Sequence, residues 1–247
     1  MLGVVAAFPV EVGALLARRR WERREEGGVR LYRQSEGGLL VAVAGMGREG
    51  AERAVRLLAG YRPTGLLSTG FAVALDGTLS PGTVVVPERL SSLDGDGLRP
   101  GLALGADPLL LEVCRRAPGA TLQVVSEGVT VPRVLVSPEE KRRLGRLTGA
   151  AIADMESFWT GALAAAMGIP FLAVRAVFDT PYDALPPVLG RPLRGAPGWA
   201  TLRWAFPRPL WWPRLWRWWG VARRARTALG EAIAALAVAW EGRRGAA

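Results

Sequence analysis

Two segments in the second half of the chain decide the fold, Ile152-Ala-Asp-Met-Glu-Ser157 and Phe171-Leu-Ala-Val-Arg-Ala-Val-Phe-Asp179. The second segment is almost entirely apolar, which is typical of a strand covered on both faces. Residues 157–167 between them have the pattern of a helix, so the order is strand, helix, strand. Both strands end in acidic residues. In α/β proteins ligands bind beyond the carboxyl ends of the strands, so these acids also indicate a candidate site.

The same alternation of strands and helices continues outward over the rest of the chain. Strands are predicted at residues 2–8, 29–33, 39–44, 65–69, 83–86, 121–126, 152–155 and 171–177, and helices at 10–19, 49–59, 108–117, from Ser137 onward and at 157–167. A chain of 247 residues is long enough to bury a full core. We therefore predict an α/β protein, with a single-domain mixed β-sheet flanked by helices in three α/β/α layers.

The composition changes near residue 190, so we divide the chain into a main unit, 1–190, and a Pro/Trp/Arg-rich segment, 191–247, that packs on it. Trp199–Trp219 contains seven of the ten tryptophans. Arg214–Trp240 has the pattern of an amphipathic helix, with an apolar stripe of Leu215, Trp218, Ala222, Ala225, Leu229, Ile233 and Leu236. Three interpretations of the tryptophan-rich part stay open: a lid or dimer contact, a membrane-surface contact, or ordinary core.

Composition excludes several classes of chemistry. The chain has no histidine and one cysteine, Cys114, which lies in a predicted helix and is expected to be core. Ser-His-Asp and Cys-His catalysis and almost all zinc sites are thereby excluded, so we predict no metal and no cofactor. The net charge is +10, with Lys141 the only lysine, but no nucleic-acid-binding module is present. Acid–base chemistry near neutral pH must therefore depend mainly on Asp and Glu.

Three acids follow predicted strands, and each also has an ordinary structural explanation. Glu156 could accept hydrogen bonds from a vicinal diol or cap a helix. Asp179 could hold a proton for a leaving group or start a turn. Glu11 lies in the first turn of a helix, where an acid complements the helix dipole. A fourth segment, Leu66–Asp76, places glycine-turn backbone near the end of the sheet, and its glycine spacing is not that of a P-loop.

Together and in this order, the four segments resemble the nucleoside phosphorylase/nucleosidase superfamily that contains the methylthioadenosine/S-adenosylhomocysteine nucleosidases. The likeness covers about residues 2–187. Glu140–Ser157 and Asp179–Pro187 are most similar to the hopanoid-associated phosphorylases, a subgroup thought to remove adenine from an adenosyl lipid. The Asp-Met-Glu and Arg-Ala-Val-Phe-Asp pair carries the resemblance, and the glycine loops are less specific.

The resemblance implies roles for individual residues. Glu156 matches the glutamate that binds the ribose 2′- and 3′-hydroxyls, and Met155 the methionine packed on the sugar. Asp179 matches the acid that protonates purine N7, and Glu11 the glutamate that orients the attacking water. Val131 matches the position whose backbone contacts the base.

The chain departs from the family where phosphorylases hold phosphate, because Ser68 and Phe71 stand where an arginine and a serine are usual. Arg48, at a predicted helix N-terminus, is the candidate replacement as an anion ligand. Phe178 and Ala74 replace a usual serine and glycine and crowd the pocket. Water and phosphate therefore both stay open as nucleophile, with water through Glu11 preferred.

The resulting prediction is an enzyme that cleaves the N-glycosidic bond of a purine nucleoside, with adenine as the base and a hydrophobic 5′ substituent. The alternative is a non-catalytic or membrane-peripheral nucleoside-binding protein of the same fold. The expected partners are the nucleoside, phosphate if the reaction is phosphorolytic, and a second copy in a homodimer; nucleic acid is not expected. The single cysteine and the short apolar N-terminal segment predict a cytoplasmic protein, with peripheral membrane contact through the tryptophan-rich segment.

Overall fold

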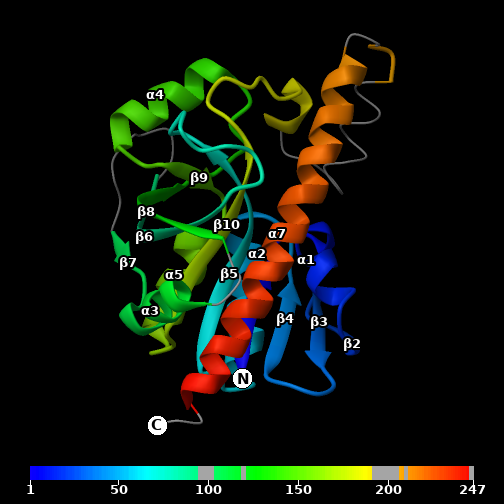
Figure 1. Cartoon of the computed structure of the whole chain (residues 1–247), viewed down its shortest axis with the longest axis vertical. Coiled ribbons are helices and arrows are strands. Elements are labelled where there is room, and N and C mark those ends of the chain that lie inside the picture. Colours follow the sequence, from blue (N-terminus) through cyan, green and yellow to red (C-terminus); the bar gives the residue numbers. More distant parts are fainter. Residues whose placement is uncertain (94–102, 118–120, 191–205, 209–210, 245–247) are drawn as a thin grey trace.

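The computed structural model describes residues 1–93, 103–117, 121–190, 206–208 and 211–244. Its strands are β1 (Leu2–Ala6), β2 (Trp21–Glu26), β3 (Val29–Gln34), β4 (Leu39–Val43), β5 (Gly65–Ala74), β6 (Val84–Ser92), β7 (Leu104–Gly105), β8 (Leu122–Thr130), β9 (Ile152–Asp154) and β10 (Phe171–Asp179) (Figure 1). Its helices are α1 (Pro9–Leu16), α2 (Gly47–Ala59), α3 (Pro108–Arg116), α4 (Pro138–Thr148), α5 (Ser157–Ala166) and α7 (Trp212–Arg244), with a 3-10 turn η1 (Pro187–Gly190).

The strands form one mixed sheet in the order β10-β6-β8-β9-β5-β1-β4-β3-β2, with β7 paired to β6. β10 also pairs in parallel with β5, so β5, β10, β6, β8 and β9 close into a ring. From β5 the open part of the sheet continues through β1, β4, β3 and β2. The predicted mixed α/β class is confirmed, and the closed ring is a feature that the strand pattern did not predict.

Ring closure explains why several strands are longer than the sequence predicted. β8 continues to Thr130 and β6 to Ser92, and their last residues pair with each other in parallel. β8 and β5 also pair with the short strand β9. These extensions contain polar residues that are nevertheless buried, so hydrophobicity did not mark them as strand. β2 was not predicted because its residues are nearly all charged and exposed, and it is held by pairing with β3 along its whole length.

The predicted helix start at Ser137 is present in α4. The Ser137 side chain accepts a hydrogen bond from the Glu140 N–H at 3.1 Å, and Pro138 occupies the first helical position. The helix ends at Gly149, whose φ of 70° is the left-handed conformation that glycine adopts without steric cost. The helix lies across the upper end of the ring (Figure 1), and its Lys141 reaches Asp179.

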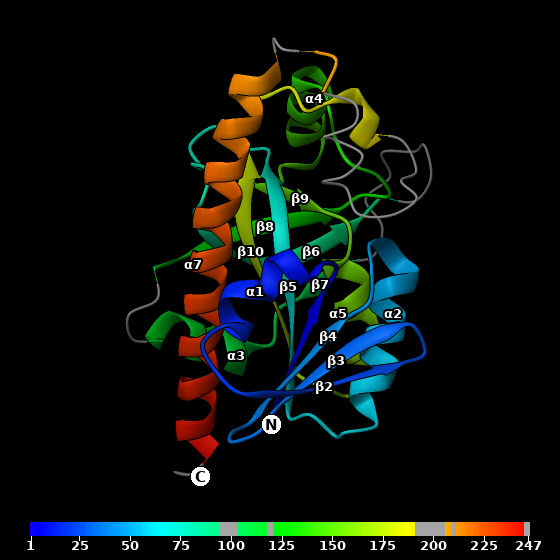
Figure 2. The same ribbon diagram turned by 90° about the vertical axis from the view of Figure 1, so that its right-hand side faces the viewer.

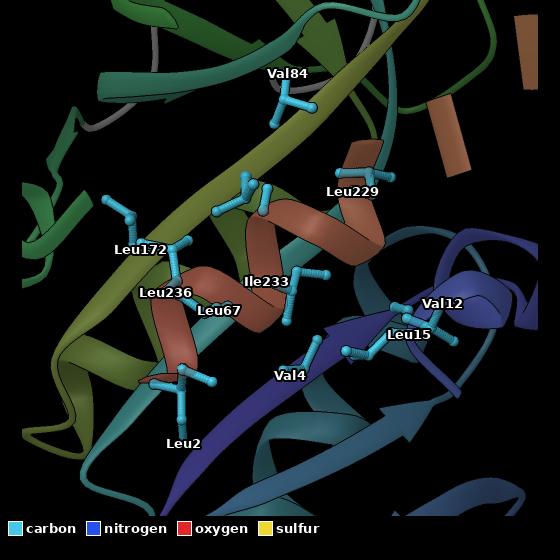
Figure 3. Packing of buried hydrophobic residues seen from close by; sticks show 14 of the residues in the cluster. Leu2, Val4, Val12, Leu15, Leu67, Val84, Leu172, Leu229, Ile233 and Leu236 are labelled. Atoms are coloured by element: carbon cyan, nitrogen blue, oxygen red, sulfur yellow. The ribbon is translucent and has the colours of Figure 1, made fainter. Parts of the chain in front are cut away.

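Helices cover both faces of the sheet. α1, α3 and α7 lie on one face, and α2 and α5 lie on the other (Figure 2). The largest core cluster is on the first face, where side chains of β1, β5 and β10 meet those of α1 and α7 (Figure 3). Cys114 belongs to this cluster and is 3% exposed, as expected for core.

α7 is a 33-residue helix that packs lengthwise on α1 and β10. Its buried residues are Trp218, Val221, Ala225, Leu229, Ala232, Ile233, Leu236, Ala237 and Trp240. Of the predicted stripe, Leu215 and Ala222 are only half-buried, and Val221 takes the inner position instead. Within the described part of the chain, no helix is long and apolar enough to cross a membrane.

Candidate active site

Two of the predicted acids meet beside strands β1, β5 and β10. Glu11 follows β1 in the first turn of α1, and Glu156 follows β9 just before α5. Between them lies Arg175 of β10, which pairs with Gly70 of β5. A Cβ on Gly70 would come within 2.4 Å of Arg175 Nη1 and 2.6 Å of Glu11 Oε1. Only glycine therefore allows the guanidinium and this carboxylate to approach the strand together.

Glu11 is held by backbone hydrogen bonds. Its Oε2 accepts from the N–H groups of Ala7 at 2.9 Å and Phe8 at 2.8 Å, and its Oε1 accepts from the Phe71 N–H at 3.2 Å. Burial raises the pKa of Glu11 above its usual value, and these donors and Arg175 oppose the shift. The side chain thus caps the start of α1 and also lies in the polar cluster.

Arg175 is the central residue of this cluster, and it was not among the predicted site residues. It is 1% exposed and donates to Ser68 Oγ at 2.7 Å and to Ser157 Oγ at 2.9 Å. Its Nε lies 2.8 Å from Asp154 Oδ2, and its Nη1 lies 3.9 Å from Glu156 Oε2. The sequence signal that could have identified Arg175 is its place inside an apolar strand, because a buried charge requires partners.

Glu156 is 7% exposed, and its Oε1 accepts from the Gly47 N–H at 2.8 Å. Burial raises its pKa to about 7, with Arg175 lowering it and Asp154 and Glu11 raising it further. A carboxyl group with this pKa is partly charged near neutral pH. Met155 beside it is half-buried and offers an apolar wall.

Asp154 supports the loop between β9 and α5. Its Oδ1 accepts from the Thr130 hydroxyl at 2.8 Å, the Glu156 N–H at 3.2 Å and the Ser157 N–H at 3.1 Å. Because its other oxygen contacts Arg175, Asp154 ties the backbone of Glu156 to the guanidinium. These contacts fix the position of the Glu156 backbone, from which its carboxylate extends into the cluster.

Asp179 lies in a second polar cluster at the end of β10. It is 3% exposed, and its Oδ2 makes a short contact with the ammonium of Lys141. Lys141 is 0% exposed and also donates to the Asp183 carbonyl oxygen at 2.6 Å. Burial raises the pKa of Asp179 to about 6, although the Lys141 charge lowers it. Lys141 was not among the predicted site residues. It is the only lysine in the sequence, and this was the signal that could have identified it.

The two clusters are separated along β10. Four residues of strand from Arg175 to Asp179 correspond to roughly 13 Å, and a register shift near Val177 breaks the pairing with β5 between them. Asp179 is therefore placed to hold a different part of a ligand from Glu11 and Glu156. The rings of Phe71 and Phe178 lie 5.6 Å apart, on neighbouring strands.

The remaining predicted site residues differ in their placement. Ser68 is fully buried and accepts from Arg175, so it belongs to the first cluster. Val131 is 5% exposed, and its N–H donates to the Asp154 carbonyl at 2.7 Å, so this N–H already has a partner. Arg48 is not brought into either cluster, because it pairs with Glu52 at 2.7 Å and covers the ring of Trp159.

The site is therefore an arrangement of carboxylates with two buried cations, Arg175 and Lys141. In the residues that the structure describes, no three His, Cys, Asp or Glu side chains are grouped to hold a metal ion. One cluster can accept hydrogen bonds from hydroxyl groups and polarise a water molecule. The other can hold a proton for a leaving group. The fold and site together define a mixed α/β protein with a carboxylate site beyond its strand ends.

Comparison with known proteins gives a more specific assignment. The model of the phosphorylase superfamily matches residues 1–186. The futalosine hydrolase of Helicobacter pylori is similar in structure, with a TM-score of 0.74 and 13% identity, over 95% of this chain and 96% of that one. The 5′-methylthioadenosine/S-adenosylhomocysteine nucleosidase of Neisseria meningitidis, in complex with methylthio-immucillin-A, has a TM-score of 0.70 and 17% identity, over 94% and 97%. The S-adenosylhomocysteine nucleosidase of Streptococcus pyogenes has a TM-score of 0.69 and 19% identity, over 94% and 95%.

The family match covers three quarters of the chain and includes β1, β5, β9 and β10, which carry or support the two clusters. The chain belongs to the phosphorylase superfamily.

Proposed function

We propose that the protein cleaves the N-glycosidic bond of a purine nucleoside by hydrolysis, with adenine as the base. The observation that supports this proposal is the presence of two separate clusters of buried carboxyl groups and cations, Glu11–Arg175–Glu156 and Asp179–Lys141. Nucleosidases named for methylthioadenosine and S-adenosylhomocysteine share the fold. A hydrophobic 5′ substituent, which the hopanoid-associated motifs imply, stays a prediction.

In the proposed reaction the substrate lies between the two clusters. The Glu156 carboxylate accepts hydrogen bonds from the ribose 2′- and 3′-hydroxyls, and Met155 packs on the sugar. Asp179 donates a proton to N7, which makes the base a better leaving group. Phe71 and the backbone carbonyl of Val131 contact the base. As the glycosidic bond breaks, positive charge develops on the sugar, and the nearby carboxylates stabilise it.

The charge balance of the first cluster supports water as the nucleophile. The guanidinium of Arg175 is surrounded by the carboxyl groups of Asp154, Glu156 and Glu11, so it has no excess positive charge to hold a phosphate dianion. Arg48, the predicted phosphate ligand, is paired with Glu52 outside the cluster. Two groups remain to orient a water molecule: the Glu11 carboxyl group and the Ser68 hydroxyl, which accepts a hydrogen bond from Arg175.

The test is release of free base from methylthioadenosine, adenosine and inosine, in phosphate-free buffer and after addition of phosphate. Hydrolysis predicts equal rates in both buffers and free pentose as the second product. Strict dependence on phosphate, with formation of a pentose 1-phosphate, would contradict the assignment of water. A Glu156→Gln preparation purified in parallel controls for contaminating nucleosidase.

A second candidate is a nucleoside-binding protein without turnover. The contact between the Phe71 and Phe178 rings favours it, because the two rings crowd the strand ends where the base would enter. Calorimetric binding of methylthioadenosine without release of adenine would support this candidate. Release of base would exclude it.

A further inference from the structure

The first turns of α7 expose a row of large aromatic side chains. Trp212, Trp216 and Trp219 are 48%, 72% and 58% exposed, and Phe206 just before the helix is 75% exposed. Positions 212, 216 and 219 follow the spacing of one helix face. Together with Arg223, which lies over the Trp219 ring, we call these three tryptophans the Trp/Arg face. Figures 1 and 2 show that this part of α7 extends past the sheet, at the same end as α4.

The Trp/Arg face is separate from the face that α7 buries. In the same turns Trp218 and Val221 are 6% and 4% exposed. Trp216 and Trp219 contact each other edge to face, with centroids 6.1 Å apart, and Arg223 lies 5.2 Å from the Trp219 ring. The exposed rings of Trp216 and Trp219 therefore lie on a different side of the helix from Trp218 and Val221, which are buried.

The sequence around this face is strongly basic, and in the structure Arg217 is paired with Asp183. The segment between Asp183 and Glu231 contains nine arginines and no Asp or Glu. A protein partner would have to be strongly acidic, and a second copy docked through the same face would place arginine against arginine. Alternating tryptophan and arginine on a helix surface matches the headgroup region of an anionic bilayer, where indole rings sit at the interface and arginines meet phosphates.

We propose that the Trp/Arg face binds the surface of an anionic lipid bilayer, with the first turns of α7 lying on the membrane. Beside this face, a cavity of about 460 Å³ lies between the first turns of α7 and the loop that follows β10, lined by Tyr182, Asp183, Ala184, Pro213, Arg214 and Arg217. Asp183 holds Lys141 through its carbonyl, so the bound membrane would lie at the Asp179 end of the active site. This inference does not depend on which nucleoside is cleaved.

The experiment is co-sedimentation of the full-length protein with vesicles of phosphatidylcholine alone and of phosphatidylcholine with phosphatidylglycerol. We expect binding to the anionic vesicles, at least about tenfold weaker binding to the neutral ones, and loss of binding as salt is raised. Trp216→Ser/Trp219→Ser should reduce partitioning about tenfold or more. Arg223→Gln should reduce it about fivefold.

The same helix provides matched controls. Val238→Ser removes an exposed apolar side chain at the other end of α7, and Arg243→Gln removes an exposed charge there. Both should bind like the wild type, and circular dichroism should show that every variant is folded. Absence of vesicle binding, or equal binding by the tryptophan variant and its control, would overturn the proposal. A dimer that dissociates in Trp216→Ser/Trp219→Ser would also overturn it and assign the face to a second copy.

Discussion

Lys141 is the only lysine beside 31 arginines, and its ammonium is buried against the proposed general acid. An ammonium is a compact point charge, and here it lies against one carboxylate oxygen of Asp179. The ammonium also favours the charged form of Asp179 and so lowers its pKa. Lys141 is therefore a positioning residue that sets when Asp179 holds a proton.

The first prediction tests whether Lys141 sets the pKa of Asp179. Lys141→Met removes the charge that lowers the pKa of Asp179, so that pKa should rise above about 6. Since the proposed reaction needs protonated Asp179, the basic limb of the kcat/KM profile should move to higher pH. Arg143→Gln, an exposed position on the same helix, is the control and should leave the profile unchanged. An unshifted limb in Lys141→Met would contradict the assigned role.

The second prediction separates catalysis by Asp179 from its structural pairing. Asp179→Asn should lower turnover by about 10²–10⁴-fold. It should also destabilise the fold by about 3–5 kcal/mol, because the buried Lys141 charge keeps the Asp183 carbonyl but loses its carboxylate counter-charge. Adding Lys141→Met should recover much of the stability in urea denaturation but none of the turnover. Recovery of turnover in the double variant would show that Asp179 is not the acid.

At the scale of elements, α7 is part of the core although it lies beyond the family match at residues 1–186. Leu229, Ile233 and Leu236 pack between α1 and the strands β1, β5 and β10. Trp240 donates to the Thr64 hydroxyl at 3.0 Å, which fixes the C-terminal end of the helix just before β5. The helix therefore stabilises the strands that carry Arg175 and Asp179.

The third prediction measures this contribution. Ile233→Ala should lower the free energy of unfolding by about 2–5 kcal/mol, because Ile233 is 0% exposed and its removal leaves a cavity. Val238→Ala is the control, since Val238 is 56% exposed and should cost less than about 0.5 kcal/mol. Chemical denaturation of both variants tests the comparison. Equal losses would mean that α7 does not form part of the core.

For the whole molecule, the buried acids link stability to pH. Burial raises the pKa of Glu156 from 4.5 to about 7, so the folded state binds its proton more tightly than the unfolded state does. The stabilisation is complete below pH 4.5 and is lost as the pH rises through about 7. Asp179 has the same effect. Its pKa is raised from 3.8 to about 6, so its stabilisation is complete below pH 3.8 and is lost as the pH rises through about 6.

The fourth prediction uses a variant that cannot titrate. Glu156→Gln should be more stable than the wild type at pH 8, and the difference should shrink towards pH 5. The full effect of a shift of this size is on the order of 3 kcal/mol. Thermal unfolding of both proteins between pH 5 and pH 8 measures it. A constant difference across this range would show that Glu156 ionises normally. Nucleoside cleavage should fall by orders of magnitude in this variant, since its amide replaces the carboxylate acceptor.

The homodimer and the cytoplasmic location inferred from the sequence stay predictions at this scale. Light scattering after size-exclusion chromatography measures the oligomeric state. Because the Trp/Arg face repels its own copy, a dimer should persist in Trp216→Ser/Trp219→Ser.

The sequence by itself determined the class of fold, and it indicated the acids Glu11, Glu156 and Asp179, whose roles stay predictions. Alternating apolar segments define the strands, and with no histidine the carboxylates were the available acid–base groups. The local signal at Ser137 and Pro138 also fixed the start of α4. These features depend on neighbouring residues along the chain, so they are visible without the fold.

Only the tertiary structure decided which charges neutralise one another. Arg175 meets Asp154 and Glu156 because β10 pairs with β5 and lies beside the start of α5, and Lys141 reaches Asp179 from α4. The closed ring is likewise a long-range property, since it needs β10 to pair with both β5 and β6. The energy of a buried charge depends on partners distant in sequence, and spacing along the chain does not contain that information.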